Sequence, residues 1–341
     1  MRPFEYASPT QKEQVVSLLD SDWGKAEILA GGTDLLALMK DDVLHPSRLV
    51  NIKKVEGISG ISFNARTGLR AGALMRMQDF ADHADVRQHY PTVASATDDA
   101  ASPQIRNMAT IGGNLCQRPR CWYFRNGFGL LAMGENGKSM VLEGDNRYHA
   151  ILGNDGPAYF VSPSSVAPAL IAHNAKVHIL GPGGTREVEL EKFYVIPSSQ
   201  DEREHDLKPN EIITDILIPP PPAGLHSAQC ELRQKADFDW PYAVASVALT
   251  MSGNAVKSAR IVLGQVAPIP WVSSEAAEAL VGKAITEQTA DAAGQAAVSK
   301  AKGLGRNDYK IQLARVAVKR AILAAAKSAP HEAAAGKEGK S

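Results

Sequence analysis

Cysteine is scarce in this sequence, with three residues in 341. So few thiols exclude a disulfide-stapled scaffold, and their odd number is typical of reduced cysteines in a cytosolic protein. No apolar run approaches the roughly 20 residues that cross a bilayer, so we predict no membrane span. Residues 1–6 also lack the apolar core of a signal peptide. We therefore expect a cytoplasmic chain, periplasmic only if a signal-bearing partner exports it.

An excess of charge is also missing, because Lys+Arg and Asp+Glu both number 37. This balance argues against nucleic acid or an anionic membrane as the main partner. The sequence contains no H-E-x-x-H and no G-x-S-x-G pattern, so we predict no metal ligands and no catalytic nucleophile. What remains is an ordinary globular composition, 44% hydrophobic and 22% charged, on a chain long enough for two or three lobes.

A Gly-Gly turn near the N-terminus is the first sign of function. It lies between an apolar run at residues 26–29, typical of a buried strand, and the start of a helix at residue 35. Glycines let the backbone approach a ligand, and the first N–H groups of a helix are unpaired, an arrangement suited to a pyrophosphate. Alone, the pattern also fits a plain turn. Its residues are Ala30, Gly31, Gly32, Thr33, Asp34 and Leu35.

A second stretch further along the chain has a similar sequence pattern. It places a hydroxyl and an apolar residue before Gly-Gly and an amide after it, in the order Thr110-Ile111-Gly112-Gly113-Asn114. A polar, turn-like segment that includes Ser102 leads towards it. Two such elements could hold one extended ligand from two sides, which makes the pair far more specific than either turn.

The two stretches resemble the FAD-binding signatures of the flavin-carrying medium subunit of molybdenum hydroxylases, the xanthine dehydrogenase, carbon monoxide dehydrogenase and aldehyde oxidoreductase types. The segments at residues 114–125 and 144–153 are most similar to the bacterial aldehyde oxidoreductase branch. The resemblance covers about residues 3–327. It implies FAD as cofactor, a large subunit with molybdopterin, a small subunit with two [2Fe-2S] clusters, and a dimer of heterotrimers.

The resemblance also implies which residues bind FAD. Residues 30–35 and 110–114 would line the phosphates and the ribityl chain, and Ser102 would approach the second loop. Asp145 and Arg147 lie in the segment like that of the aldehyde oxidoreductases, where they either hold the flavin side of the site or are solvated. Lys235 would lie near the flavin pyrimidine, or is a surface lysine. The predicted set is Ala30, Gly31, Gly32, Thr33, Asp34, Leu35, Ser102, Thr110, Gly112, Gly113, Asn114, Asp145, Arg147 and Lys235.

The cysteines bear on a second cofactor. Some members of the resembled branch hold a [4Fe-4S] cluster in this subunit through four cysteines, the usual ligand number for a cubane. Here Cys116 and Cys121 are followed by no cysteine until Cys230. We therefore predict that this chain carries no cluster and that its cysteines are ordinary thiols.

The sequence predicts an α+β fold in which a two-lobed FAD-binding domain precedes a C-terminal α+β domain. The lobes are expected at residues 1–55 and 56–218, and the proline-rich stretch 219–224 is the expected linker. The second lobe is expected to contain a hairpin around residues 64–66 and helices at 80–89 and 162–174, and a hairpin turn is expected at Gly253-Asn254 in the C-terminal domain. Three antiparallel strands are predicted at 228–235, 243–251 and 255–265, followed by helices at 273–281, 286–302 and 308–327. Residues 328–341 are expected to form a disordered tail.

Two other functions compete with an electron-transfer subunit. A self-sufficient FAD oxidase would need its own substrate pocket and base, and it often carries a histidine for covalent flavin attachment, which the first loop lacks. A scaffold subunit that has lost its flavin would keep the fold, but intact Gly-Gly loops argue against it. Bound yellow chromophore, then co-purified molybdenum and iron, would separate the three.

Overall fold

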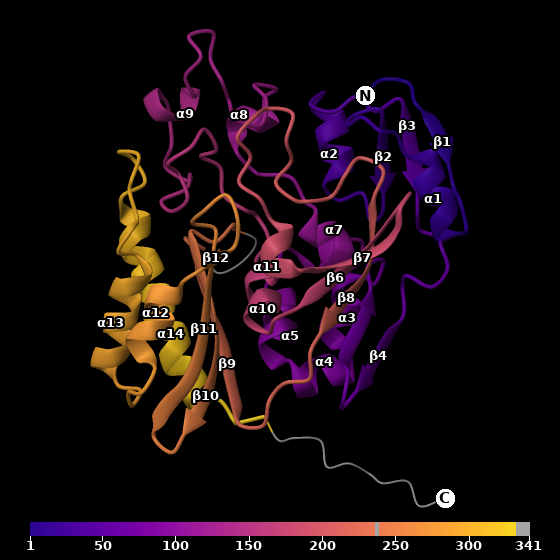
Figure 1. Ribbon diagram of the computed structural model, residues 1–341. Coiled ribbons are helices and arrows are strands. Elements are labelled where there is room, and N and C mark those ends of the chain that lie inside the picture. The colour runs from indigo at the N-terminus through magenta and orange to yellow at the C-terminus, as the bar shows by residue number, and fades with distance from the viewer. Residues whose placement is uncertain (236–238, 332–341) are drawn as a thin grey trace, which may run out of the picture.

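The described part of the chain forms three β-sheets with associated helices, as a computed structural model shows (Figure 1). The structure describes residues 1–235 and 239–331. Among these residues no helix is both long and apolar enough to cross a membrane.

The first sheet is small and entirely parallel, with strand order β1-β3-β2. Parallel neighbours need crossover connections, and two short helices provide them. The first buries Val15 in one cluster with Ala26 and Val50 of the sheet, whereas the second buries Leu38 in another cluster, with Phe124 and Leu131. The predicted order of strand, Gly-Gly turn and helix is therefore observed. The elements are β1 (Glu5–Ala7), α1 (Lys12–Leu18), β2 (Ala26–Leu29), α2 (Leu35–Lys40) and β3 (Arg48–Asn51).

The second sheet has five antiparallel strands in the order β4-β5-β8-β6-β7. The predicted hairpin around residues 64–66 forms β4 and β5, whereas the sequence did not predict β7, a largely exposed edge strand with few apolar residues. The predicted helix at 80–89 is divided into two at His83. The strands are β4 (Ile61–Asn64), β5 (Gly68–Gly72), β6 (Lys176–Gly181), β7 (Gly184–Glu189) and β8 (Ile212–Ile218).

Helices lie between these strands in the chain, and most of their buried residues share one core with this sheet. The helix predicted at 162–174 begins only at Val166, because Ser162 and Pro163 are not helical and the Ser164 hydroxyl accepts a hydrogen bond from the backbone N–H of Ala167. The longer helices are α3 (Met77–Asp82), α4 (Ala84–His89), α5 (Pro91–Asp98) and α10 (Val166–Ala172), and the single-turn ones are α6 (Pro103–Arg106), α7 (Ile111–Leu115), α8 (Trp122–Arg125), α9 (Met140–Glu143) and α11 (Leu190–Phe193).

The C-terminal sheet has four antiparallel strands in the order β12-β11-β10-β9, not the three predicted. The fourth is only two residues long, too short to show an alternating pattern in the sequence. Three helices lie together on one side of this sheet (Figure 1). The elements are β9 (Leu225–Leu232), β10 (Ala243–Ser252), β11 (Ala255–Gly264), β12 (Trp271–Val272), α12 (Ser274–Leu280), α13 (Glu287–Ala297) and α14 (Tyr309–Lys327).

The C-terminal sheet also packs against the second lobe. Ala248 of β10 and Val262 of β11 belong to the same buried cluster as Val93 of α5 and Leu170 of α10. The chain end is tied to this region, because the His331 N–H donates to the Leu225 carbonyl over 2.9 Å. Residues 328–331 of the predicted disordered tail are thus hydrogen-bonded to the start of β9 and to Gly224 before it. The rest of the predicted tail, residues 332–341, lies outside the described residues.

Candidate functional site

The two Gly-Gly loops touch each other backbone to backbone. A Cβ built on Gly31 would lie 2.0 Å from the carbonyl oxygen of Met108 and 3.0 Å from the Cα of Ala109. Only glycine allows this approach. The first loop therefore packs directly against the start of the second, and the two stretches that the sequence singled out form one site.

The first loop is rich in unpaired backbone donors. Among the described residues, none accepts a hydrogen bond from the backbone N–H groups of residues 31–35. Gly32 has a left-handed φ of 76°, which turns the chain between β2 and α2. Five consecutive N–H groups without a protein partner, on a loop that lines a cavity, suit a ligand with several acceptor oxygens.

The second loop has the opposite character. Its Gly112 N–H donates to the Ala73 carbonyl over 2.9 Å, and its Gly113 N–H donates to the Thr110 hydroxyl over 3.1 Å. The Asn114 side chain accepts a hydrogen bond from the Ser164 hydroxyl over 2.6 Å. The sequence predicts ligand donors here, but the short helix α7 packs so closely on Ala73 that these N–H groups are already used. This loop supports the first one.

A cavity of about 610 Å³ runs along both loops. It lies between the first lobe, the second lobe and the loop that follows β9, and its size is that of pockets for large cofactors. The structure places most of the predicted site residues on its wall, namely Ala30, Gly31, Gly32, Thr33, Asp34, Leu35, Ser102, Thr110, Gly112, Gly113 and Asn114.

Three predicted residues do not line this cavity. Asp145 and Arg147 form an ion pair with each other at 2.5 Å, and half of the Arg147 side chain is exposed. Lys235 is exposed, and its backbone N–H donates to the Asp239 carboxylate over 3.1 Å. The structure therefore does not place these three residues on the wall of this cavity, and their contact with FAD stays a prediction.

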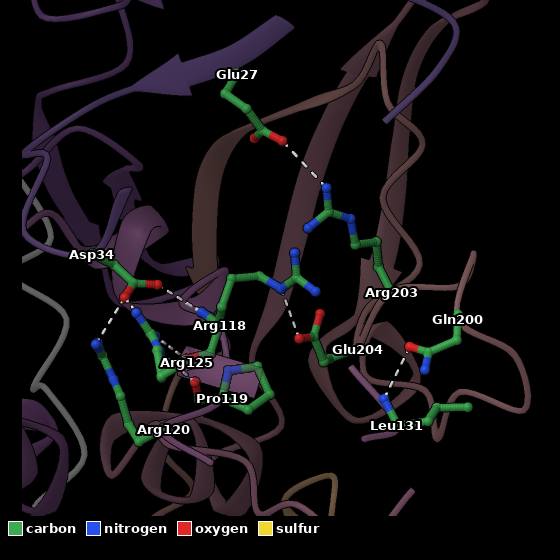
Figure 2. Close-up of polar contacts among 10 residues, drawn as sticks. All are labelled: Glu27, Asp34, Arg118, Pro119, Arg120, Arg125, Leu131, Gln200, Arg203 and Glu204. Atoms are coloured by element: carbon green, nitrogen blue, oxygen red, sulfur yellow. Dashed lines mark hydrogen bonds and ion pairs between the residues drawn. The ribbon is translucent and has the colours of Figure 1, made fainter. Parts of the chain in front are cut away.

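Asp34 occupies the centre of a charged network that the sequence did not reveal (Figure 2). Its Oδ1 lies 2.8 Å from a terminal nitrogen of Arg120 and 2.8 Å from one of Arg125. Its Oδ2 accepts the backbone N–H of Arg118, also over 2.8 Å. Both carboxylate oxygens are thus engaged within the protein, so Asp34 fastens residues 118–125 across the first loop.

Two further ion pairs extend this network along the cavity (Figure 2). The Nε of Arg118 donates to Glu204 over 2.7 Å, and Arg203 donates to Glu27 over 3.2 Å. Burial raises the pKa of Glu27 to about 7, although the nearby charge of Arg118 opposes this rise. The run Arg118-Pro119-Arg120 was visible in the sequence, but its partners come from distant segments.

The two cysteines near the site are free, partly buried thiols. Burial raises the pKa of Cys116 to about 12 and also raises that of Cys121, whose sulfur lies 3.2 Å from Nε2 of His149. Over the ranges 1–235 and 239–331, no group of three or more His, Cys, Asp or Glu side chains is arranged to hold a metal ion. The absence of an iron–sulfur cluster stays a prediction.

Comparison with known proteins identifies the family. Residues 2–221 match the FAD-binding domain of molybdopterin dehydrogenases, and residues 229–325 match the C-terminal domain of the CO dehydrogenase flavoprotein. The chain belongs to the family of FAD-binding subunits of molybdenum hydroxylases. FAD is the cofactor of this family, and the chain is the flavoprotein subunit of an oxidoreductase.

Individual relatives of this FAD-binding subunit agree with the family match. The chain is 35% identical over 292 residues to the aldehyde oxidoreductase FAD-binding subunit PaoB of Escherichia coli, covering 85% of this chain and 88% of that one. It is 30% identical to the carbon monoxide dehydrogenase medium chain of Hydrogenophaga pseudoflava, with 94% and 96% coverage. The solved structure of that dehydrogenase superposes with a TM-score of 0.74, covering 95% of this chain and 97% of that one.

Proposed function

We propose that this chain carries electrons from a partner's [2Fe-2S] clusters through FAD to an external acceptor, as the medium subunit of a three-subunit molybdenum hydroxylase. A molybdopterin-binding large subunit would oxidise the substrate, an aldehyde or an aromatic heterocycle. The sequence identity to an aldehyde oxidoreductase subunit favours an aldehyde as the substrate. We further propose that two such heterotrimers form a dimer.

The unpaired N–H groups of residues 31–35 are the observation that carries the proposed FAD site. They would bind the diphosphate, with the Thr33 hydroxyl beside them. FAD itself supplies the redox chemistry, accepting and releasing electrons, and the protein binds, orients and shields it. In this arrangement the backbone at Met108 and Ala109 holds the first loop in place, α7 faces the cofactor as part of the cavity wall, and Asp34 secures the neighbouring segment 118–125.

The first test is an absorbance spectrum of the purified full-length chain, followed by chromatography of the supernatant after acid precipitation. Flavin bands with free FAD in the supernatant would support non-covalent FAD binding. A broad iron–sulfur absorption that bleaches with dithionite, with about four irons per chain, would overturn the predicted absence of a cluster. Failure to bind added FAD, alone and with its partner subunits, would refute the proposed site.

The variant Gly113→Val tests the placement of the ligand. A Cβ at Gly113 would meet only the Thr110 hydroxyl, at 2.9 Å, so a larger side chain is expected to enter the cavity without disturbing the core. We expect the folded variant to retain no flavin. If it purifies fully flavinated, the second loop does not face the cofactor as proposed.

Co-purification tests the role in the complex. A tagged chain expressed with its neighbouring subunits should retain both, with molybdenum and about four irons of the [2Fe-2S] type per heterotrimer. Reduction of FAD by substrate in this complex, and not in the chain alone, is the expected result. Substrate turnover by the chain alone would favour a self-sufficient oxidase.

A further inference from the structure

Two arginines in the cavity wall are only partly satisfied by the protein. Arg118 is 9% exposed and the Arg203 side chain is also 9% exposed, and both line the cavity. Each guanidinium makes one hydrogen bond to a carboxylate, through Nε of Arg118 and a terminal nitrogen of Arg203. Among the described residues, neither terminal nitrogen of Arg118 has a hydrogen-bond partner. These donors are not sealed inside the protein but open to the cavity, where the acceptor oxygens of a ligand could reach them.

The two side chains are held in similar ways. The guanidinium of Arg118 lies 4.8 Å from the ring centre of Phe124, and that of Arg203 lies 4.3 Å from the ring centre of Trp23. An aromatic face on one side and a carboxylate at one edge restrict each group to a narrow range of orientations. In Figure 2 the Arg118 side chain extends away from Asp34, towards the region between Glu204 and Glu27.

The charges of the network leave an excess of positive charge. Its four arginines, at 118, 120, 125 and 203, face three carboxyl groups, those of Glu27, Asp34 and Glu204. The excess is one charge when Glu27 is ionised and two when it is protonated. Because burial raises the pKa of Glu27 to about 7, both states are populated near neutral pH. The cavity wall also carries Arg233, Glu211 and Asp239, so the positive excess belongs to the network alone, which an anionic group could balance.

We propose that Arg118 and Arg203 form a clamp that binds the FAD diphosphate from the side opposite the first Gly-Gly loop. This inference rests on the proposed placement of FAD in the cavity. Adenine and oxidised isoalloxazine are uncharged, so the diphosphate is the only part of oxidised FAD that supplies two negative charges. The terminal edge of a guanidinium matches two phosphate oxygens with parallel N–H bonds.

The position of the clamp supports the diphosphate over the ring systems. The backbone of Arg118 is hydrogen-bonded to Asp34, within the loop whose N–H groups are unpaired. Glu27, the partner of Arg203, lies on β2, the strand that leads into that loop. Backbone donors and guanidinium groups thus line the same cavity, in which one extended anion could contact both.

A ligand series separates a phosphate contact from a general structural role. The full-length chain, or the subunit complex stripped of flavin if the chain needs its partners, is titrated with FAD and riboflavin by fluorescence quenching and with ADP by calorimetry. For Arg118→Met we expect FAD and ADP to bind about tenfold to a hundredfold more weakly, the effect of losing hydrogen bonds between charged groups. Riboflavin, which has no phosphate, should change by less than about threefold.

Matched variants complete the test. Arg203→Met should show the same selectivity, and Arg118→Lys should recover part of the lost affinity because it restores the charge without the planar fork. Arg87→Met, which removes an exposed arginine that pairs with Asp82 and Asp98 on the surface, should alter none of the affinities. If Arg118→Met does not fold, Arg203→Met and Arg118→Lys decide the question.

The outcomes that contradict the clamp are distinct from those that contradict the FAD site. Unchanged FAD and ADP affinity in both methionine variants would overturn the clamp. An equal loss of riboflavin affinity would also overturn it, because it would mean that the arginines contact the flavin ring or have a purely structural role. A wild-type protein that binds neither FAD nor ADP would instead refute the placement of FAD on which the clamp depends.

Discussion

The contact between the two Gly-Gly loops leads to a quantitative prediction for Gly31→Ala. The added methyl group would lie 2.0 Å from the Met108 carbonyl oxygen and 2.8 Å from its carbonyl carbon. Carbon–oxygen contacts in proteins are about 3.3 Å or longer, so the loops must separate by more than about 1 Å. Overpacking typically costs about 1–3 kcal/mol, and we expect about 3 kcal/mol here because the obstacle is backbone, which cannot change rotamer.

Thermal unfolding followed by circular dichroism measures this cost. A loss of 1 kcal/mol lowers the Tm of a domain of 150–250 residues by about 2–4 °C, so Gly31→Ala should lower it by about 6–12 °C. The variant should also bind FAD weakly, since the displaced loop no longer presents its N–H groups together. Gly113→Ala is the matched control, because its methyl group would meet only the Thr110 hydroxyl, at 2.9 Å. We expect its Tm to stay within about 2 °C of the wild type.

The reasoning fails if Gly31→Ala melts like the wild type and retains its flavin. That result would mean that the two loops do not touch in solution. Loss of stability in both glycine variants to the same extent would show instead that any side chain in these loops is harmful, irrespective of the contact with Met108. The comparison therefore tests the geometry and not merely the presence of glycine.

Three further predictions concern charged groups. Asp34→Ala should lower the unfolding free energy by about 3 kcal/mol, because it leaves two partly buried arginines without their carboxylate. It should also weaken FAD and riboflavin binding to a similar degree. If the flavin titrations showed a loss for FAD alone, Asp34 would not act by holding residues 118–125 in place. Glu27→Gln should become more stable relative to the wild type as pH rises from 5 to 8, by at most about 3 kcal/mol, which denaturant unfolding at each pH measures. The sign follows from the pKa of Glu27, which is about 7 in the folded state and about 4.5 in the unfolded state. The folded wild type therefore keeps a proton that the unfolded chain has released, and its stability falls as pH rises between these two values. Parallel pH profiles of the wild type and Glu27→Gln would refute this reasoning. Lys310→Met should lower the free energy of unfolding, measured in urea, by about 3 kcal/mol. The reason is that the buried Nζ of Lys310 donates to the carbonyls of Tyr148, His149 and Gln265, at 3.0, 3.0 and 2.7 Å. A loss below about 1 kcal/mol would show that these carbonyls find other partners.

Local patterns predicted the elements that depend on local chemistry. The strand before Gly31, the hairpin of β4 and β5, and the turn at Gly253 between β10 and β11 all have sequence signals of a few residues, and all are present. The two-residue strand β12 and the polar edge strand β7 have no such signal, since each becomes a strand only by pairing with a neighbour. The count of three C-terminal strands was wrong for this reason.

The candidate site divides in the same way. Glycine pairs marked both loops in the sequence, because close backbone approach needs glycine whatever the tertiary structure. The sequence did not identify the arginines of the cavity wall as binding residues. Arg118 is positioned at the cavity only by its hydrogen bonds with Asp34 and Glu204, which are far away in the chain. Asp145, Arg147 and Lys235 were proposed from resemblance, and the fold does not place them on the wall of this cavity.

Two loops with nearly the same sequence pattern have different tasks here, and the difference lies in their neighbours. Ala73 lies beside α7 and accepts the N–H of Gly112, whereas no acceptor within the described part of the chain pairs with the N–H groups of the first loop. Both loops need their glycines, but Gly31 allows contact with Met108 and Gly112 allows contact with Ala73. A Gly-Gly pattern therefore reports close approach of something to the backbone. Whether that is a ligand or another part of the chain depends on which hydrogen bonds the fold has already made.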